Sequence, residues 1–241
     1  MSNVVDLSKS PGKISAMFDA IAPRYDFLNH VLSAGIDRRW RARAIRSLRL
    51  TGSEVVLDVC TGTADLAIAA RTATPRAARV VGVDFAGAML EIGRDKAARA
   101  GLAHEVMFVR GDATRIPVAD SSMDAVTVAF GIRNVEDVPA ACREMRRVLR
   151  RGGRLAILEF AIPTMPVIRT AYLTYFRHIL PAVGRLVSRH SAAYGYLPDS
   201  VGAFATPTQL MSTLEASGFV DVAAVRMTCG IVFLYTARRG D

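Results

Sequence analysis

Three aspartates end short apolar runs with the composition of buried β-strands, and their spacing constrains the fold more than any other feature. The runs are residues 54–58, 79–84 and 106–112. Their last residues, Asp58, Asp84 and Asp112, are 26 and 28 residues apart, a spacing typical of successive strand–helix units. Ligands of open parallel sheets bind where the strands end. We therefore expect the three carboxylates to face one crevice.

The rest of the chain continues this alternation of strands and helices. Further strands are expected at residues 125–130, 154–160, 220–227 and 231–237. Helices are expected after residue 65 and at residues 86–100, 138–149 and 208–217. A chain of 241 residues with 51% hydrophobic side chains can bury one substantial core and does not need two. The pattern predicts a single α/β domain built on a parallel, helix-covered sheet.

Two segments fall outside the alternation. Residues 1–50 are expected to be helical, because apolar side chains between residues 17 and 28 recur at helical spacing. Residues 164–197 are apolar and aromatic with interspersed arginines. We interpret this second stretch as an inserted helical cover over the strand ends.

Composition excludes several classes of protein. No run approaches the roughly 18 apolar residues of a spanning helix, and the N-terminus has no apolar signal region, so the chain is expected to stay in the cytoplasm. Cys60, Cys142 and Cys229 are far apart and lack metal-ligand spacing. Neither a disulfide framework nor a metal site is therefore expected.

The net charge of +9 raises nucleic acid and an anionic membrane surface as partners. Nearly all of the excess is arginine, which codon bias explains equally well. Six arginines cluster between residues 38 and 49, with apolar residues at helical spacing among them. A solvated helix face explains this cluster without any ligand.

The loop after the first expected strand is a candidate ligand-binding turn. Gly62 permits close approach of the backbone to a ligand, and Thr63 or Asp65 is expected to cap the helix that follows. The loop matches neither the dinucleotide-binding glycine pattern nor a P-loop, so a less anionic ligand is favoured. The alternative is a simple turn between strand and helix.

The next two strand ends add groups that suit an adenosine. Asp84 is placed to accept hydrogen bonds from both hydroxyls of a ribose. Its alternative role is to cap the following helix. Asp112, or the backbone at Ala113, suits an adenine amino group. Together the three strand ends indicate an adenosine-containing ligand.

These motifs resemble those of class I methyltransferases that use S-adenosylmethionine. Four further segments narrow the likeness: residues 17–29, residues 32–41, residues 130–135 and residues 196–200. They resemble the UbiE/MenG/COQ5 family, the C-methyltransferases of menaquinone and ubiquinone biosynthesis, over nearly the whole chain. Cys60 and Ala64 replace two of the usual loop glycines, and Ala129 replaces a frequent serine.

The resemblance implies a Rossmann-like class I methyltransferase fold, with a mostly parallel seven-stranded sheet and helices on both faces. It divides the single domain into an N-terminal helical lid (1–50), a cofactor-binding βα core (51–163), a helical insertion over the active site (164–205) and a C-terminal helix and strand pair (206–241). The implied cofactor is S-adenosylmethionine. The implied cofactor-binding residues are Asp58, Gly62, Thr63, Asp84, Asp112, Ala113 and Ala129.

Methyl transfer to a quinol ring carbon needs the loss of a phenolic proton, whose pKa is near 10. A cation beside the phenolate lowers that pKa, and Arg133 is the candidate, with Asn134 helping to hold a water. The alternative for Arg133 is a surface salt bridge with Glu136 or Asp137. The residues expected to orient the substrate are Tyr25, Asp26 and Tyr196.

The expected substrate is a prenylated quinol, 2-demethylmenaquinol first and the benzoquinol precursor of ubiquinone as the alternative. The apolar insertion suits a prenyl tail and transient contact with the inner face of the cell membrane; alternatively, it forms a homodimer interface. Another small phenolic or lipid acceptor also remains open. A basic RNA-binding module or a noncatalytic subunit ranks below these, because RNA-binding motifs are absent and the acids that would hold a cofactor are present. No nucleic acid partner is expected.

Overall fold

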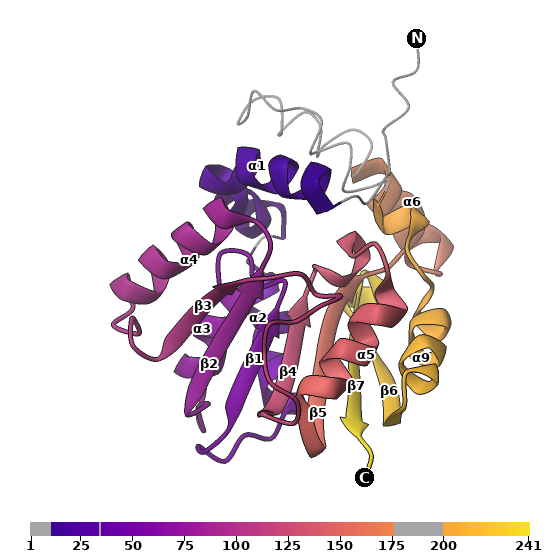
Figure 1. Ribbon diagram of the computed structural model, residues 1–241. Helices are drawn as coiled ribbons and strands as arrows, with labels where there is room; N and C mark the ends of the chain where they lie inside the picture. The colour runs from indigo at the N-terminus through magenta and orange to yellow at the C-terminus, as the bar shows by residue number, and fades with distance from the viewer. Residues whose placement is uncertain (1–10, 34, 176–199) are drawn as a thin grey trace.

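The protein is described by a computed structural model that covers residues 11–33, 35–175 and 200–241, with the backbone alone at residues 11 and 23–32. The strands form one seven-stranded sheet in the order β3-β2-β1-β4-β5-β7-β6 (Figure 1). They are β1 (Val55–Val59), β2 (Arg79–Asp84), β3 (Val106–Arg110), β4 (Met123–Ala129), β5 (Leu149–Phe160), β6 (Phe219–Met227) and β7 (Val232–Arg239). Only β7 runs antiparallel to its neighbours. The predicted mostly parallel, seven-stranded sheet is confirmed.

Helices cover both faces of the sheet, as predicted. The described α-helices are α1 (Pro11–Leu32), α2 (Asp37–Ser47), α3 (Asp65–Thr72), α4 (Gly87–Arg99), α5 (Val138–Val148), α6 (Pro166–Thr174) and α9 (Pro207–Ala216). Local signals mark the starts of two of these helices: Asp137 caps α5, and Thr206 and Gln209 form a capping box at α9. Short 3-10 turns, η1 (Ile132–Asn134) and η3 (Thr228–Gly230), complete the described elements. Within the described ranges, no helix is long and apolar enough to cross a membrane.

The sheet separates two apolar cores. Along β1, Leu57 and Val59 pack with the apolar sides of α5 and α9, whereas Val56 packs with those of α2 and α3. This division follows from the alternation of side chains along a strand. All three side chains are fully buried, and burying each contributes roughly 1.5–3 kcal/mol. Two packed faces therefore leave the strand ends as the place where polar groups can meet.

The helices of the expected lid and cover lie at one end of the sheet. Figure 1 shows α1 and α6 beyond the carboxyl ends of the parallel strands, with α1 beside α4. Phe18 and Ile21 of α1 pack against Met89 of α4. Asp19 Oδ1 also accepts a hydrogen bond from the Ala88 backbone at 2.9 Å. The division of the chain into four parts remains a prediction, because much of residues 164–205 lies outside the described residues.

Candidate active site

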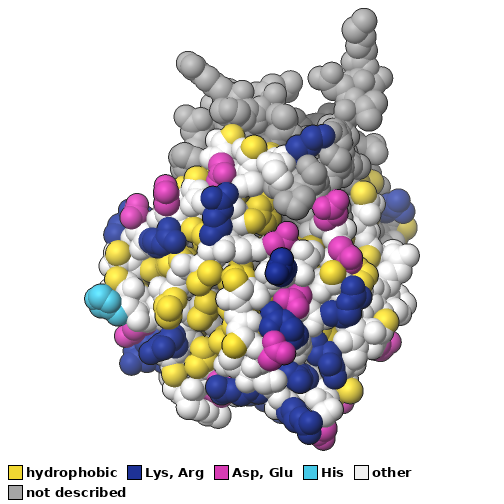
Figure 2. Space-filling model, viewed as in Figure 1, with side chains coloured by type: hydrophobic (Ala, Val, Ile, Leu, Met, Phe, Trp, Pro, Cys, Tyr) yellow, Lys and Arg dark blue, Asp and Glu magenta, His cyan; other side chains and the backbone are white. Residues whose placement is uncertain are grey.

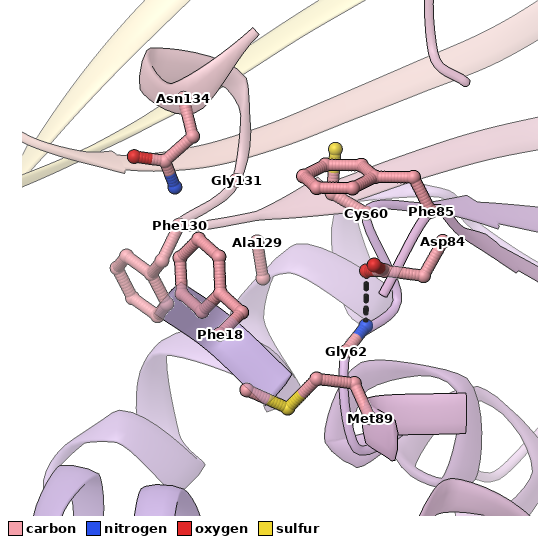
Figure 3. A pocket seen from close by; sticks show the side chains of 10 residues that line it. All are labelled: Phe18, Cys60, Gly62, Asp84, Phe85, Met89, Ala129, Phe130, Gly131 and Asn134. Carbon is pink, nitrogen blue, oxygen red and sulfur yellow. Dashed lines mark hydrogen bonds between the residues drawn. The ribbon is translucent and has the colours of Figure 1, made fainter. Parts of the chain in front are cut away.

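Three adjoining hollows follow the carboxyl ends of the parallel strands. The central hollow, of about 40 Å³, is lined by Asp84 and by groups from α1, the β1 and β2 loops and the β4 turn (Figure 3). The inner hollow, of about 30 Å³, contains Asp58 and shares Gly62 with the central one. The outer hollow, of about 330 Å³, contains Asp112 and shares Asn134 with the central one. The three expected carboxylates therefore lie along one row.

The turn after β1 is built in a left-handed conformation. Cys60, Gly62 and Ala64 have φ of 54°, 53° and 68°. A side chain in this region costs roughly 1–2 kcal/mol, which is why glycine is favoured at such positions. The two residues that replace the usual glycines therefore keep the backbone geometry at a cost in strain.

The cap predicted for the helix after this turn is wrong. The N-cap of α3 is Ala64, which makes no side-chain hydrogen bond. Asp65 is the first helical residue, and it pairs with Lys96 at 2.5 Å and with Arg41 at 3.2 Å. Thr63 is buried and accepts a hydrogen bond from Lys96 at 3.3 Å. Lys96 binds both side chains and Arg41 binds Asp65, so neither Thr63 nor Asp65 caps α3.

Asp84 joins the β1 turn to the start of α4. Its Oδ2 accepts from the Gly62 backbone at 2.8 Å, the bond drawn in Figure 3, and its Oδ1 accepts from the Ala86 backbone at 2.9 Å. Burial raises the pKa of this carboxyl, and the nearby Asp19 carboxylate raises it further. The residue thus fixes two loops and lines the central hollow. Asp84 does not itself cap α4, which was the alternative role expected for it. It binds the backbone of Ala86, the N-cap residue of that helix.

Asp58 is the most buried of the three acids, with 1% of its surface exposed. Thr61 and Thr127 each donate a side-chain hydrogen bond to it at 2.7 Å. Burial raises the pKa of Asp58 to about 6, while these hydrogen bonds and the charge of Arg41 lower it. A carboxylate held in this way favours a cationic ligand beside it.

The third acid stands two residues beyond β3 and shapes its own loop. Asp112 Oδ1 accepts from the Thr114 backbone at 2.7 Å and from the Thr114 hydroxyl at 2.8 Å. Ala113 is 5% exposed. Both line the outer hollow, whose volume lies within the range of small-ligand sites. Their role toward an adenine stays a prediction.

The turn after β4 carries Arg133 and Asn134. Phe130 has φ of 58°, and a Cβ on Gly131 would lie 2.3 Å from Cys60 Cβ, so only glycine fits there. Asn134 lines both the central and the outer hollow. Ala129 lines the central and the inner hollow. The turn therefore forms the wall opposite α4.

The Arg133 side chain is buried in the turn after β4. Its side chain is 6% exposed, and Nη1 donates to Oε1 of the fully buried Glu159 at 2.8 Å and to the Phe130 carbonyl. Glu159 also accepts from the backbones of Arg133 (3.3 Å) and Phe160 (2.8 Å). The surface salt bridge with Glu136 or Asp137 is thus wrong, and Arg133 is absent from the residues that line the three hollows. A buried pair holds the turn instead.

Of the other expected substrate contacts, Tyr25 and Asp26 lie in α1 with only their backbone described, and Tyr196 lies outside the described residues. The structure adds residues that the sequence interpretation did not select. Phe18 and Phe85 line the central hollow, and Arg41 lines the inner one. Only their positions in the sequence could have indicated these residues. Phe85 directly follows Asp84, and Phe18 and Arg41 lie in the segments 17–29 and 32–41 that resemble the family. Among the described residues, no cluster suited to a metal ion is present.

Comparisons with known proteins agree with this geometry. Two relatives are the "Ubiquinone/menaquinone biosynthesis C-methyltransferase UbiE" of Geotalea daltonii, 43% identical over 97% of this chain and 99% of that protein, and the "Demethylmenaquinone methyltransferase" of Bacteroides fragilis, 40% identical over 96% and 94%. Among solved structures, the [4+2]-cyclase SpnF has a TM-score of 0.69 at 19% identity, over 94% of this chain and 95% of that one. A possible histamine N-methyltransferase from Thermotoga maritima has a TM-score of 0.65 at 16% identity, over 93% and 98%. These two structures support the fold. The sequence model described as the ubiE/COQ5 methyltransferase family matches residues 6–239, and the chain therefore belongs to that family.

Proposed function

We propose that this methyltransferase uses S-adenosylmethionine to methylate a ring carbon of a prenylated quinol, 2-demethylmenaquinol first. The observation that carries the proposal is the row of Asp58, Asp84 and Asp112 beside a left-handed loop, in a chain that matches quinone-biosynthesis C-methyltransferases over nearly its whole length. The benzoquinol precursor of ubiquinone is the second candidate, because relatives of this chain carry both pathway names.

The donor set at the strand ends fits this cofactor. S-adenosylmethionine would supply an electrophilic methyl group on a sulfonium, and buried carboxylates with raised pKa stabilise a cation in their vicinity. Asp84 would hold the ribose, and Asp112 with Ala113 would hold the adenine. Gly62 has open space where a Cβ would project, so backbone can approach the ligand. Asp58, Thr63 and Ala129 would border the methionine end.

The central hollow is smaller than any adenosine. It holds about 40 Å³, whereas small-molecule sites usually enclose roughly 300–1,000 Å³. Phe18 of α1 is one of its walls (Figure 3). Cofactor entry would therefore widen the central hollow by displacing the side chains that line it, Phe18 among them.

The groups available to the quinol come from the β4 turn. The Asn134 side chain faces two hollows and would orient the ring oxygen, either directly or through a water. Arg133 would act by holding this turn, since its guanidinium is bound to Glu159. Tyr25, Asp26 and Tyr196 stay proposed substrate contacts.

The test is transfer of a labelled methyl group from S-adenosylmethionine to reduced demethylmenaquinol and to the reduced demethylated benzoquinol, each with lipid present. Methylation of either quinol supports the reaction class, and the ratio of rates names the preferred ring. Cofactor binding without transfer to either quinol would contradict the proposed acceptor. Asn134→Ala should reduce turnover in the same assay, and an unchanged rate would remove Asn134 from the site.

We further propose that the enzyme works in the cytoplasm and meets its lipid-soluble substrate at the inner face of the cell membrane. A prenyl tail is insoluble in water, and the end of the sheet that carries the hollows also carries α1 and α6 (Figure 1). Vesicle sedimentation with and without quinol tests this contact. A homodimer formed through the cover is tested by the sedimentation coefficient in lipid-free buffer.

A further inference from the structure

A fourth hollow lies away from the carboxyl ends of the parallel strands, between α2 and one face of β5, β7 and β6. It has a volume of about 580 Å³. We call it the arginine groove. Its charged lining residues are Arg43, Arg46, Arg49, Arg154, Asp221 and Arg238. Its floor includes Val225 and Leu234. The groove is thus basic at its edges and apolar at its base.

Positive charge exceeds negative charge in the arginine groove. Arg154 pairs with Glu54 at 3.1 Å, and Arg238 pairs with Asp221. The side chains of Arg43, Arg46 and Arg49 form no hydrogen bond or ion pair with any residue that the structure describes. Among the residues that the structure describes, these three guanidinium groups therefore have no carboxylate partner. On the face shown in Figure 2, by contrast, basic and acidic side chains are interspersed.

The fold brings these arginines together at a cost in stability. Arg49 follows the C-cap Leu48 of α2 with φ of 47°, a position where glycine is the usual residue. Its carbonyl accepts a hydrogen bond from Arg154 Nη1 at 2.8 Å. Arg154 and Arg238 are direct cross-strand partners, and each is paired with an acid of its own, Glu54 and Asp221. A solvated helix face accounts for arginines on α2 and does not account for this convergence.

The position of the arginine groove argues against a membrane surface. Arg154 pairs in the sheet with Ala125, near the start of β4, and Arg238 lies near the end of antiparallel β7. Both therefore mark the amino ends of the parallel strands. A bilayer bound there would leave the row of hollows facing away from the lipid.

We propose that the arginine groove binds a soluble oligophosphate anion, such as the triphosphate chain of a nucleotide. Guanidinium groups form paired hydrogen bonds with phosphate oxygens, and those of Arg43, Arg46 and Arg49 have no carboxylate partner in the part of the chain that the structure describes. The volume of about 580 Å³ suits a small ligand. Val225, 37% exposed, supplies apolar surface for the organic part of such a ligand. This site is separate from the proposed cofactor site.

The test is titration calorimetry of the full chain with inorganic triphosphate and with ATP, at about 50 mM and about 300 mM KCl. Arg46→Ala/Arg49→Ala removes two of the three charges that lack a carboxylate. Arg76→Ala/Arg99→Ala removes the same charge from exposed positions outside the groove and is the matched control. Unliganded melting temperatures of both variants check that the fold is kept.

We expect saturable binding of both anions at low salt. The groove variant should weaken binding by about tenfold or more, the control should not, and high salt should weaken binding in every protein. Equal effects of the two double variants would overturn the proposal. So would an absence of binding, competition by S-adenosylhomocysteine, or binding confined to phosphatidylglycerol vesicles.

Discussion

At the carboxyl ends of the parallel strands, Asp58 and Asp84 are buried and hydrogen-bonded, whereas Arg43, Arg46 and Arg49 in the arginine groove are exposed. Asp58 and Asp84 are 1% and 8% exposed, and each accepts two hydrogen bonds from neighbouring segments. Arg43 and Arg46 are exposed and bind no described residue. The acids shape the backbone around them, whereas the arginines leave it largely unaffected.

This difference separates two kinds of site. A buried carboxylate is costly when ionised, so the carboxyl end favours a cation that remains bound while chemistry occurs. Exposed arginines are screened by salt and attract an anion that exchanges freely. Mutations at the carboxyl end should therefore change stability and cofactor binding together. Mutations of the exposed arginines at the amino end should change anion binding and should change stability by about 1 kcal/mol or less.

The largest effect should come from Glu159→Ala. It leaves the buried Arg133 guanidinium without its carboxylate, which should lower the free energy of unfolding by about 3–5 kcal/mol. Urea denaturation measures the change, and Glu215→Ala, at an exposed position of α9, is the control. Equal losses in the two variants would show that the pair does not hold the β4 turn.

The pH dependence of the free energy of unfolding should reveal the raised pKa of Asp58. Its native pKa of about 6 exceeds the ordinary value of 3.8, so the native state binds the proton more tightly than the unfolded chain. Stability from this group is therefore present at low pH and lost as pH rises through 6. Relative to Asp58→Asn, unfolding of the wild type should become easier by about 2 kcal/mol between about pH 4 and about pH 7. Parallel curves for the two proteins would contradict the raised pKa.

Asp84→Ala should weaken cofactor binding by about a hundredfold. The Gly62 and Ala86 backbone N–H groups lose their hydrogen-bond acceptor, and the ribose hydroxyls lose the carboxylate proposed to bind them. Calorimetry with S-adenosylhomocysteine measures the effect. Asp95→Ala, at an exposed position of α4, should bind as the wild type does. An unchanged affinity in Asp84→Ala would remove this residue from the ribose site.

The smallest effect should be a gain in stability from a substitution in the arginine groove. Arg49→Gly removes a side chain from a left-handed position and one charge from the arginine groove, so the free energy of unfolding should rise by about 1 kcal/mol. Arg49→Ala removes the charge and keeps the strain, and it separates the two causes. A loss of stability in Arg49→Gly would show that the side chain supports the fold.

Much of this architecture was predictable because local patterns encode it. The expected strand at residues 79–84 coincides with β2, and the expected helix at residues 138–149 differs from α5 by one residue. Short apolar runs and apolar residues at helical spacing identify these elements without any tertiary contact. The row of Asp58, Asp84 and Asp112 followed from the rule that parallel strands end together.

The capping of α3 and the partner of Arg133 were not predictable in the same way. Thr63 and Asp65 have the chemistry of caps, but Lys96 and Arg41, from α4 and α2, bind them instead. Glu159 lies 26 residues beyond Arg133 and reaches it only because β4 and β5 are neighbours. Arg133 therefore pairs with a buried acid on the neighbouring strand and not with Glu136 or Asp137, which are close to it in the sequence.

The sequence alone determined the order of strands and helices, the acids at the strand ends and the family to which the chain belongs, because each is a local pattern or a run of motifs. Only the tertiary structure decided which charges pair, how narrow the central hollow is and that Arg49, Arg154 and Arg238 meet in one groove. Those outcomes depend on contacts between residues far apart in the chain, and the sheet order that sets such contacts is a property of the whole fold.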